Sequence, residues 1–120
     1  MMKYTEDHEW LRVEGDLVVV GITEHAATQL GDVVFVELPE PETVVATGDE
    51  VVVIESVKAA SDILAPVDGE IVEVNEKLND TPGLVNDDAT GDAWFFKMKL
   101  DDLSVLDAFM SEDEYNDFIG

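Results

Sequence analysis

Two apolar runs surround a single lysine near the middle of the chain: Val51-Val52-Val53-Ile54-Glu55-Ser56-Val57, then Lys58-Ala59-Ala60, then Ser61-Asp62-Ile63-Leu64-Ala65. Both runs have the length and the apolar, β-branched content that are typical of buried or half-buried strands. The segment between them is short enough only for a tight turn. The sequence therefore predicts a β-hairpin that carries Lys58 at its tip.

Strand patterns continue on both sides of this hairpin. Residues 10–13 and 17–22 flank a short connection that contains Gly15, which is typical of another hairpin. Further strands are predicted at residues 33–38, 70–74 and 94–100. The chain is thus expected to be mostly β-structure.

Helical signals are confined to short segments. Thr23 can cap a helix that runs to Leu30 and stops at Gly31. Apolar residues at helical spacing predict a helical segment within residues 101–110, and Ser111 with Glu114 forms a capping box for a last helix. Residues 79–91 are expected to form a loop.

Together these elements predict a mainly β fold, a flattened β-barrel or sandwich with short helices and a helical C-terminal end. Gly48 and Gly69 lie ten and eleven residues from Lys58, one on each side, which fits two similar halves around one turn. No long linker rich in Pro, Gly or Ser divides the chain. We therefore expect residues 1–120 to form a single domain, with N-terminal and C-terminal extensions packed on the central hairpin.

Acidic residues dominate the charge balance: 29 Asp and Glu stand against six Lys and Arg, which gives a formal net charge of −23. A field of this sign repels phosphate backbones and anionic lipids, so partners among nucleic acids and membranes are not expected. Acidic residues spread along the whole chain resemble the surfaces of proteins from salt-accumulating organisms. The chain starts without an apolar export segment, and no apolar run is long enough to cross a bilayer, so we expect a cytoplasmic protein.

The chain contains no Cys, so redox chemistry would have to come from an attached group. Lys58 is best suited to carry one, because only the small or apolar Val57, Ala59 and Ala60 stand beside its amine. No phosphate loop, nucleophile elbow or spaced acid and base pair is present, so an independent enzyme is not expected.

The remaining histidines and aromatic residues point to structural roles. His8 and His25 have neither a Cys nor a second nearby His to complete a metal site. The aromatic residues in strand patterns are expected to lie in the core: Trp10, Phe35, Trp94, Phe95 and Phe96.

The segment from Glu55 to Asp62, followed by residues 65–75, resembles the lipoyl-attachment segment of the glycine cleavage H-protein family. The resemblance covers nearly the whole chain, because further stretches match the family pattern in order: residues 4–5, 8–10, 20–23, 30–39, 84–86 and 111–115. It implies a lipoyl-domain-like fold, a barrel-sandwich hybrid, and a carrier without catalytic activity of its own.

In this family lipoate is amide-linked to the lysine that corresponds to Lys58. The resemblance implies a monomeric carrier with four kinds of enzyme partner: a pyridoxal-phosphate glycine decarboxylase that loads an aminomethyl group, an aminomethyltransferase that uses tetrahydrofolate, a dihydrolipoyl dehydrogenase, and a lipoylating enzyme. A long flexible arm supplies the reversible thiol chemistry that a chain without Cys lacks, and tethering raises its effective concentration at each partner.

The resemblance also assigns binding residues. It places Glu9, Asp62, Asp7 and Gln29 in a cleft that shelters the loaded arm, where a carboxylate could bind the aminomethyl ammonium. Gln29 stands where many members have His, and Asp7 where a hydroxyl residue is common. It further implies that Glu55 and Gly69 contribute to recognition by the lipoylating enzyme.

Other interpretations of the same residues stay open. A biotin carrier would share the fold, although biotin carriers usually have Met on both sides of the lysine, where this chain has Val57 and Ala59. An H-like protein could instead relay lipoyl groups to other carriers. An acidic β domain could also bind a protein partner with Lys58 unmodified.

Overall fold

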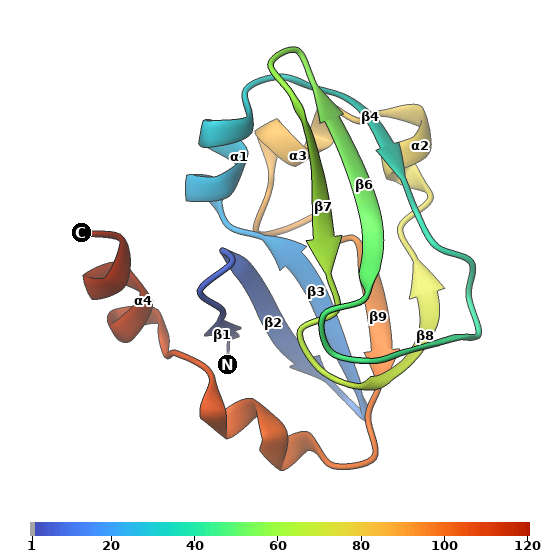
Figure 1. Ribbon diagram of the computed structural model, residues 1–120, viewed down its shortest axis with the longest axis vertical. Coiled ribbons are helices and arrows are strands. Elements are labelled where there is room, and N and C mark those ends of the chain that lie inside the picture. The colour runs from blue at the N-terminus through green and yellow to red at the C-terminus, as the bar shows by residue number, and fades with distance from the viewer. Residues whose placement is uncertain (1) are drawn as a thin grey trace.

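The computed structural model describes residues 2–120, whose nine strands form two antiparallel sheets (Figure 1). The larger sheet has the strand order β1-β2-β3-β9-β8-β5, with bounds β1 Met2–Tyr4, β2 Glu9–Glu14, β3 Leu17–Ile22, β9 Phe96–Lys99, β8 Gly69–Val74 and β5 Thr43–Val45. The smaller sheet has the order β4-β6-β7, with bounds β4 Val33–Glu37, β6 Glu50–Ser56 and β7 Ala60–Leu64. This confirms the predicted mainly β sandwich.

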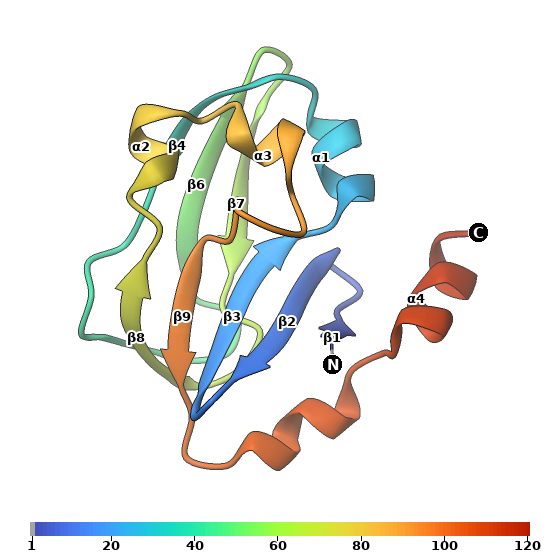
Figure 2. The ribbon, with the colours of Figure 1, turned by 180° about the vertical axis from the view of Figure 1, so that it is seen from behind.

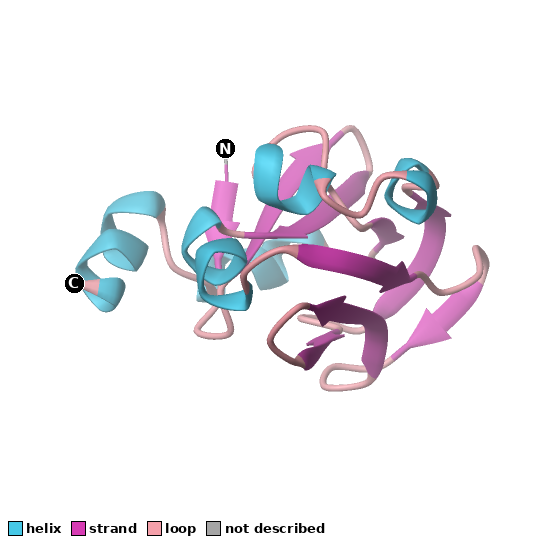
Figure 3. Cartoon of the chain, turned by 90° about the horizontal axis from the view of Figure 1, so that it is seen from above, coloured by secondary structure: helices cyan, strands magenta, loops and turns pink. Residues whose placement is uncertain are grey.

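The two predicted hairpins are both present. β2 and β3 pair across Gly15 with Glu14 opposite Leu17, and β6 and β7 pair with Glu55 opposite Ala60, so Lys58 lies in the turn at the tip. The β6–β7 hairpin belongs to the smaller sheet and the β2–β3 hairpin to the larger one, and the view from above shows the strands in separate layers (Figure 3). The alternating side chains of both layers meet between them and form the main apolar core.

The larger sheet is covered on its second face as well. Val18 and Val20 of β3 belong to the main core, whereas Val19 packs with Trp10, Tyr4 and Tyr115 in a separate apolar cluster. Strand alternation explains this division, because successive side chains point to opposite faces. The second cluster holds the C-terminal helix against the N-terminal strands.

Short helices close the ends of the sandwich (Figure 2). Their bounds are α1 Glu24–Leu30, α2 Lys77–Asp80, α3 Leu84–Asp87, the 3₁₀-helix η1 Leu103–Ala108 and α4 Glu112–Ile119. Thr23 caps α1, and Ser111 and Glu114 form the predicted capping box of α4. The longest of the described helices, α4, has eight residues, so none is long enough to cross a bilayer.

The prediction of a loop at residues 79–91 is wrong. This region contains α3, and it begins inside α2. Each helix is a single turn that buries one apolar side chain, Leu78 in α2 and Val85 in α3. A single turn is too short to produce a helical period in the sequence.

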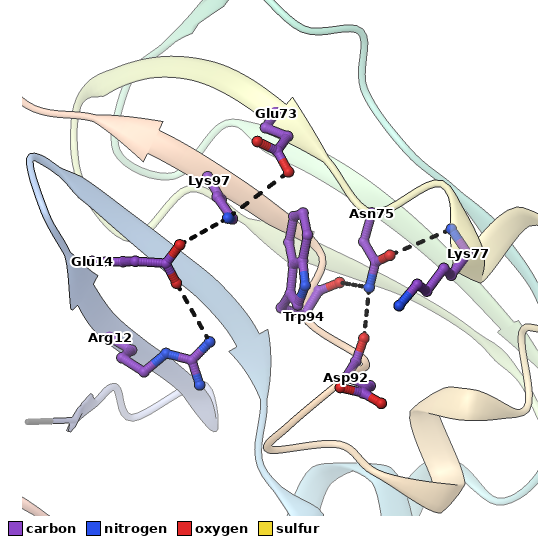
Figure 4. A network of polar contacts seen from close by, with 8 residues as sticks. All are labelled: Arg12, Glu14, Glu73, Asn75, Lys77, Asp92, Trp94 and Lys97. Atoms are coloured by element: carbon purple, nitrogen blue, oxygen red, sulfur yellow. Dashed lines mark hydrogen bonds and ion pairs between the residues drawn. The ribbon is translucent and has the colours of Figure 1, made fainter.

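Strand β9 is shorter than predicted, because Trp94 and Phe95 precede it. The Asn75 amide donates hydrogen bonds to the carbonyls of Asp92 and Trp94 at 2.7 and 2.8 Å (Figure 4). These bonds hold the segment just before β9 outside the regular hydrogen-bond pattern of the sheet. Beyond it, the Lys97 amine lies 3.0 Å from a Glu14 carboxylate oxygen and 3.8 Å from a Glu73 oxygen (Figure 4). One of the few cations thus links β9 to its neighbour β8 and, across β3, to the end of β2.

Two further elements differ from the sequence expectations. Strands β1 and β5 were not predicted, because each has only three residues. The helical segment within 101–110 is the 3₁₀-helix η1, after which Met110 forms an isolated β-bridge with Tyr4.

The prediction that Phe35 lies in the core is also wrong. The register of β4 against β6 shifts between Val33 and Phe35, which is a β-bulge. The bulge turns Val34 and Phe35 outward together, while Val33 and Val36 stay buried. Trp10, Phe95 and Phe96 are buried as predicted, and Trp94 is half-buried.

Candidate functional site

The turn that carries Lys58 is held by its own residues and by a neighbouring loop. The Ser56 hydroxyl accepts hydrogen bonds from the backbone N–H groups of Lys58 and Ala59, each at 3.2 Å. The Val57 N–H donates to the Asp32 carbonyl at 3.0 Å. The turn backbone is therefore fixed although its side chains are exposed.

The stem of Lys58 lies beside the end of helix α1. Gly31 has a φ of +78°, and a Cβ built there would lie 3.1 Å from Lys58 Cε, so a glycine leaves room for the lysine stem. The Asn86 side chain fixes this segment, because its amide donates to the Gly31 carbonyl and its oxygen accepts from Val33 N–H, both at 2.8 Å. Sequence reasoning assigned no role to Asn86, although residues 84–86 belong to the stretches that resemble the family.

The Lys58 amine has no ion-pair partner among residues 2–120, even in so acidic a protein. Lys97, by contrast, is tied to two carboxylates and lies over the Trp94 ring at 5.0 Å. Lys58 is therefore free to extend from the hairpin tip, whereas Lys97 stabilises the sheet.

One face of β7 connects this turn with a pocket at the other end of the strand. Ala60, Asp62 and Leu64 alternate with the buried Ile63, so they share the outward face. From Ala60 to Leu64 the strand rises roughly 13 Å, at about 3.3 Å per residue. Leu64 reaches the pocket and Asp62 lies one side chain nearer to the turn.

The pocket has a volume of about 360 Å³ and lies where the N-terminal segment, the end of the hairpin and the C-terminal segment meet. Its lining includes Thr5, Asp7, Glu9, Gly48, Leu64 and Phe109. Acidic groups on one side and apolar groups on the other suit a ligand that has a cationic end and an apolar body.

Glu9 is the unusual residue of this pocket. The residue is 2% exposed, and its Oε2 is buried without a hydrogen-bond partner in the described part of the chain. Oε1 accepts a hydrogen bond from the Thr5 hydroxyl at 3.3 Å. Burial, together with the nearby charge of Asp7, raises the pKa of Glu9 to about 8, which favours a neutral carboxyl at neutral pH.

The residues expected to form the arm-sheltering cleft do not all line one pocket. Glu9 and Asp7 line it together. Asp62 projects from the face of β7 that leads to the pocket, and it is exposed. Gln29 lies on the exposed side of α1, where its amide nitrogen is 3.1 Å from His25 Nε2.

The residues expected to contribute to recognition by a lipoylating enzyme lie at opposite ends of the hairpin region. Glu55 is exposed beside the Lys58 turn. Gly69 begins β8, beyond the far end of β7, where a Cβ would lie 2.8 Å from the Lys99 carbonyl oxygen. The close approach of β9 gives Gly69 a packing role.

The sequence predicts no second His near either histidine, and for the folded chain this prediction is wrong. The rings of His8 and His25 lie 4.8 Å apart, because α1 follows β3 and returns past the start of β2. No third metal-binding side chain joins them within residues 2–120. Instead, His8 Nδ1 and Thr23 Oγ1 each lie 2.8 Å from the Tyr115 hydroxyl, which connects α4 to the segment before Glu9.

Comparison with known proteins gives the same assignment over the length of the chain. The family model described as glycine cleavage H-protein matches residues 2–120. A glycine cleavage system H protein of Parvibaculum lavamentivorans is 52% identical over 118 residues, which cover 98% of this chain and 94% of that protein. The H protein of Xanthobacter autotrophicus is 55% identical over 118 residues with the same coverage of both chains.

Solved structures show the same fold. The crystal structure of a glycine cleavage system H protein from Mycobacterium marinum matches with a TM-score of 0.89 and 37% identity, and the match covers 99% of this chain and 96% of that one. The matches in sequence and in structure both extend from the first described strand to the last helix. The chain therefore belongs to the glycine cleavage H-protein family.

Proposed function

We propose that this chain is the lipoyl carrier of a glycine cleavage system, with lipoate in amide linkage to Lys58. The observation that carries the proposal is the geometry of Lys58: an exposed amine without an ion pair among the described residues, on a turn whose backbone is fixed by Ser56 and Asp32. A modifying enzyme needs an amine that is accessible and placed reproducibly. The bound lipoyl group would supply reversible disulfide and dithiol chemistry and a sulfur that holds the aminomethyl cargo.

We further propose that the Glu9 pocket shelters the aminomethyl cargo. The support is the buried Glu9 Oε2, which has no hydrogen-bond partner within residues 2–120, and the neighbouring Asp7 on the pocket wall. An ammonium ion would give Oε2 the donor it lacks and would favour the ionised carboxylate. Asp62 would contact the same cation as the loaded arm moves along β7. Gln29 would contact the arm only where the arm passes the exposed side of α1.

The proposed carrier works as one unit of residues 1–120 and depends on enzymes for every reaction. Its partners are a glycine decarboxylase, an aminomethyltransferase, a dihydrolipoyl dehydrogenase and a lipoylating enzyme. For the last of these, Glu55 would offer a direct contact beside Lys58, and Gly69 would act through the backbone position of β8. We also propose that the net charge of −23 is an adaptation to a salt-rich cytoplasm.

Substitution of Lys58 tests the carrier function. Lys58→Arg keeps the positive charge but cannot form the lipoyl amide, so glycine decarboxylation in a system reconstituted from the carrier and its four partner enzymes should fall to background. Lys77→Arg is the matched control, since Lys77 is also exposed, and it should retain full activity. Undiminished activity of Lys58→Arg would refute the assignment.

A further inference from the structure

The bulge in β4 displays an apolar patch beside the Lys58 turn. Val34 is 54% exposed and Phe35 47% exposed, and Val57 in the turn itself is 66% exposed. A regular strand would have turned one of the two β4 side chains into the core, whereas the bulge places both outside. We refer to Val34, Phe35 and Val57 as the bulge patch.

Pairing across the small sheet shows what surrounds the patch. Phe35 lies opposite Glu55, and Glu37 lies opposite Val53, which in turn pairs with Asp62. Directly paired residues share a face, so an apolar centre is edged by three exposed carboxylates, with Lys58 at the tip. Such a surface is complementary to a partner that has an apolar centre and a basic rim.

The patch and the turn are mechanically joined. Val57 N–H is bound to the Asp32 carbonyl directly before β4, and Val33 N–H is bound to the Asn86 side chain. The position of the patch relative to Lys58 is therefore fixed before any partner arrives. Preorganisation of this kind lowers the entropic cost of association.

We propose that the bulge patch is a docking surface for the enzyme that attaches the lipoyl group to Lys58. This inference rests on the proposed function. Each later enzyme meets the end of a long arm, whereas the attaching enzyme must bring its reacting atoms to the lysine amine itself. Only that enzyme is obliged to approach the turn itself, beside which the pairing of β4 with β6 places the bulge patch.

The reaction at this surface is amide formation with an activated lipoyl donor, a lipoyl adenylate. The Lys58 Nζ attacks the acyl carbon, the new C–N bond forms, and the bond from the acyl carbon to the phosphate oxygen breaks with release of AMP. The ammonium gives up two of its three protons in the overall step. The patch contributes binding and orientation and takes no part in the bond changes.

The test compares apo-protein variants as substrates of a purified lipoate-attaching enzyme supplied with lipoate and ATP. Phe35→Thr and Val34→Thr keep strand propensity and remove exposed apolar surface. The KM for Phe35→Thr should rise about tenfold, because a buried aromatic anchor contributes that much to a typical interface. Val44→Thr on β5, which removes a 78% exposed valine away from the turn, is the matched control and should behave as the parent.

Direct binding and a later reaction complete the test. The Kd of apo Phe35→Thr for the attaching enzyme should weaken in parallel with KM, while reduction of the fully lipoylated variant by dihydrolipoyl dehydrogenase should equal that of the parent. Unchanged KM and Kd in both β4 variants, or an equal loss in Val44→Thr, would overturn the docking surface. If the parent itself were not modified on Lys58, the proposed function would fail instead, so the two failures are distinguishable.

Discussion

Glu9 shows how a single residue can be both buried and suited to a cation. Its carboxyl is enclosed by the pocket and held on one side by Thr5, which leaves Oε2 without a partner. A permanently charged carboxylate in this position would be costly, and the raised pKa favours the neutral form at neutral pH. In the proposed sheltering role an ammonium ion would reverse that preference, so its docking should release a proton.

The pH dependence of stability follows from the same pKa. The folded protein holds the Glu9 proton up to about pH 8, while the unfolded chain loses it near the usual value of 4.5. The stability that Glu9 contributes is therefore fully present below pH 4.5, and it is lost as the pH rises from 4.5 through 8. The difference in free energy of unfolding between parent and Glu9→Gln should fall by up to about 1.4 kcal/mol per pH unit in this window.

Urea unfolding of both proteins from pH 5 to pH 9, at one high salt concentration, measures this difference. Contributions from the other titrating groups cancel in the comparison. Parallel stability profiles would mean that Glu9 titrates normally in the folded protein.

Retention of the cargo should depend on the same carboxyl. Glu9→Gln should speed the loss of the aminomethyl group, seen as release of formaldehyde and ammonia in the absence of the transferase, by roughly tenfold or more, since charge-assisted hydrogen bonds are stronger than neutral ones. Asp62→Asn should have a smaller effect, because Asp62 lies outside the pocket. Asp117→Asn on α4 removes an equal charge elsewhere and serves as control.

If Glu9→Gln and Asp62→Asn both release the cargo at the parental rate, the pocket does not protect it. The lipoylation level of each variant is checked by mass, so that a change in loading is not mistaken for a change in release.

At the scale of elements, the hairpin and its lysine were predictable from sequence because they depend on local patterns. The runs around Lys58 and the Thr23 cap each carry their own signal, and both are found where expected. The outward position of Phe35 was not predictable, since residues 33–36 are all apolar and their alternation has no visible phase. The burial of Glu9 was equally hidden, because in so acidic a sequence one more glutamate indicates surface.

The end of α1 offers a test of how this element positions Lys58. Gly31 and Gly15 both have positive φ, but only Gly31 has the Lys58 stem within 4 Å of a built Cβ. Gly31→Ala and Gly15→Ala should each lower the free energy of unfolding by about 1 kcal/mol through backbone strain. Only Gly31→Ala should also slow lipoylation of Lys58 by a purified attaching enzyme, because the stem must move.

Circular dichroism checks that both glycine variants are folded. Equal lipoylation rates in the two would show that the contact with Gly31 does not determine the position of Lys58. A loss of stability confined to Gly31→Ala would instead indicate that packing exceeds the backbone cost.

For the whole molecule the dominant quantity is the net charge of −23 on 120 residues. Three ion pairs among residues 2–120, all involving Glu14 or Lys97, offset little of the mutual repulsion. Salt screens like charges on the surface more strongly than contacts in the core. The melting temperature should therefore rise steeply from low to molar potassium chloride, and a flat profile would contradict the proposed adaptation to salt.

The most direct test of the account is the location of the lipoyl group on the native protein. Material purified from cells grown on glycine is digested and its peptides are mapped by mass spectrometry. We expect the mass of an amide-linked lipoyl group on Lys58 and on none of Lys3, Lys77, Lys97 and Lys99. An unmodified Lys58, a biotin adduct, or a lipoyl group on another lysine would contradict the central claim.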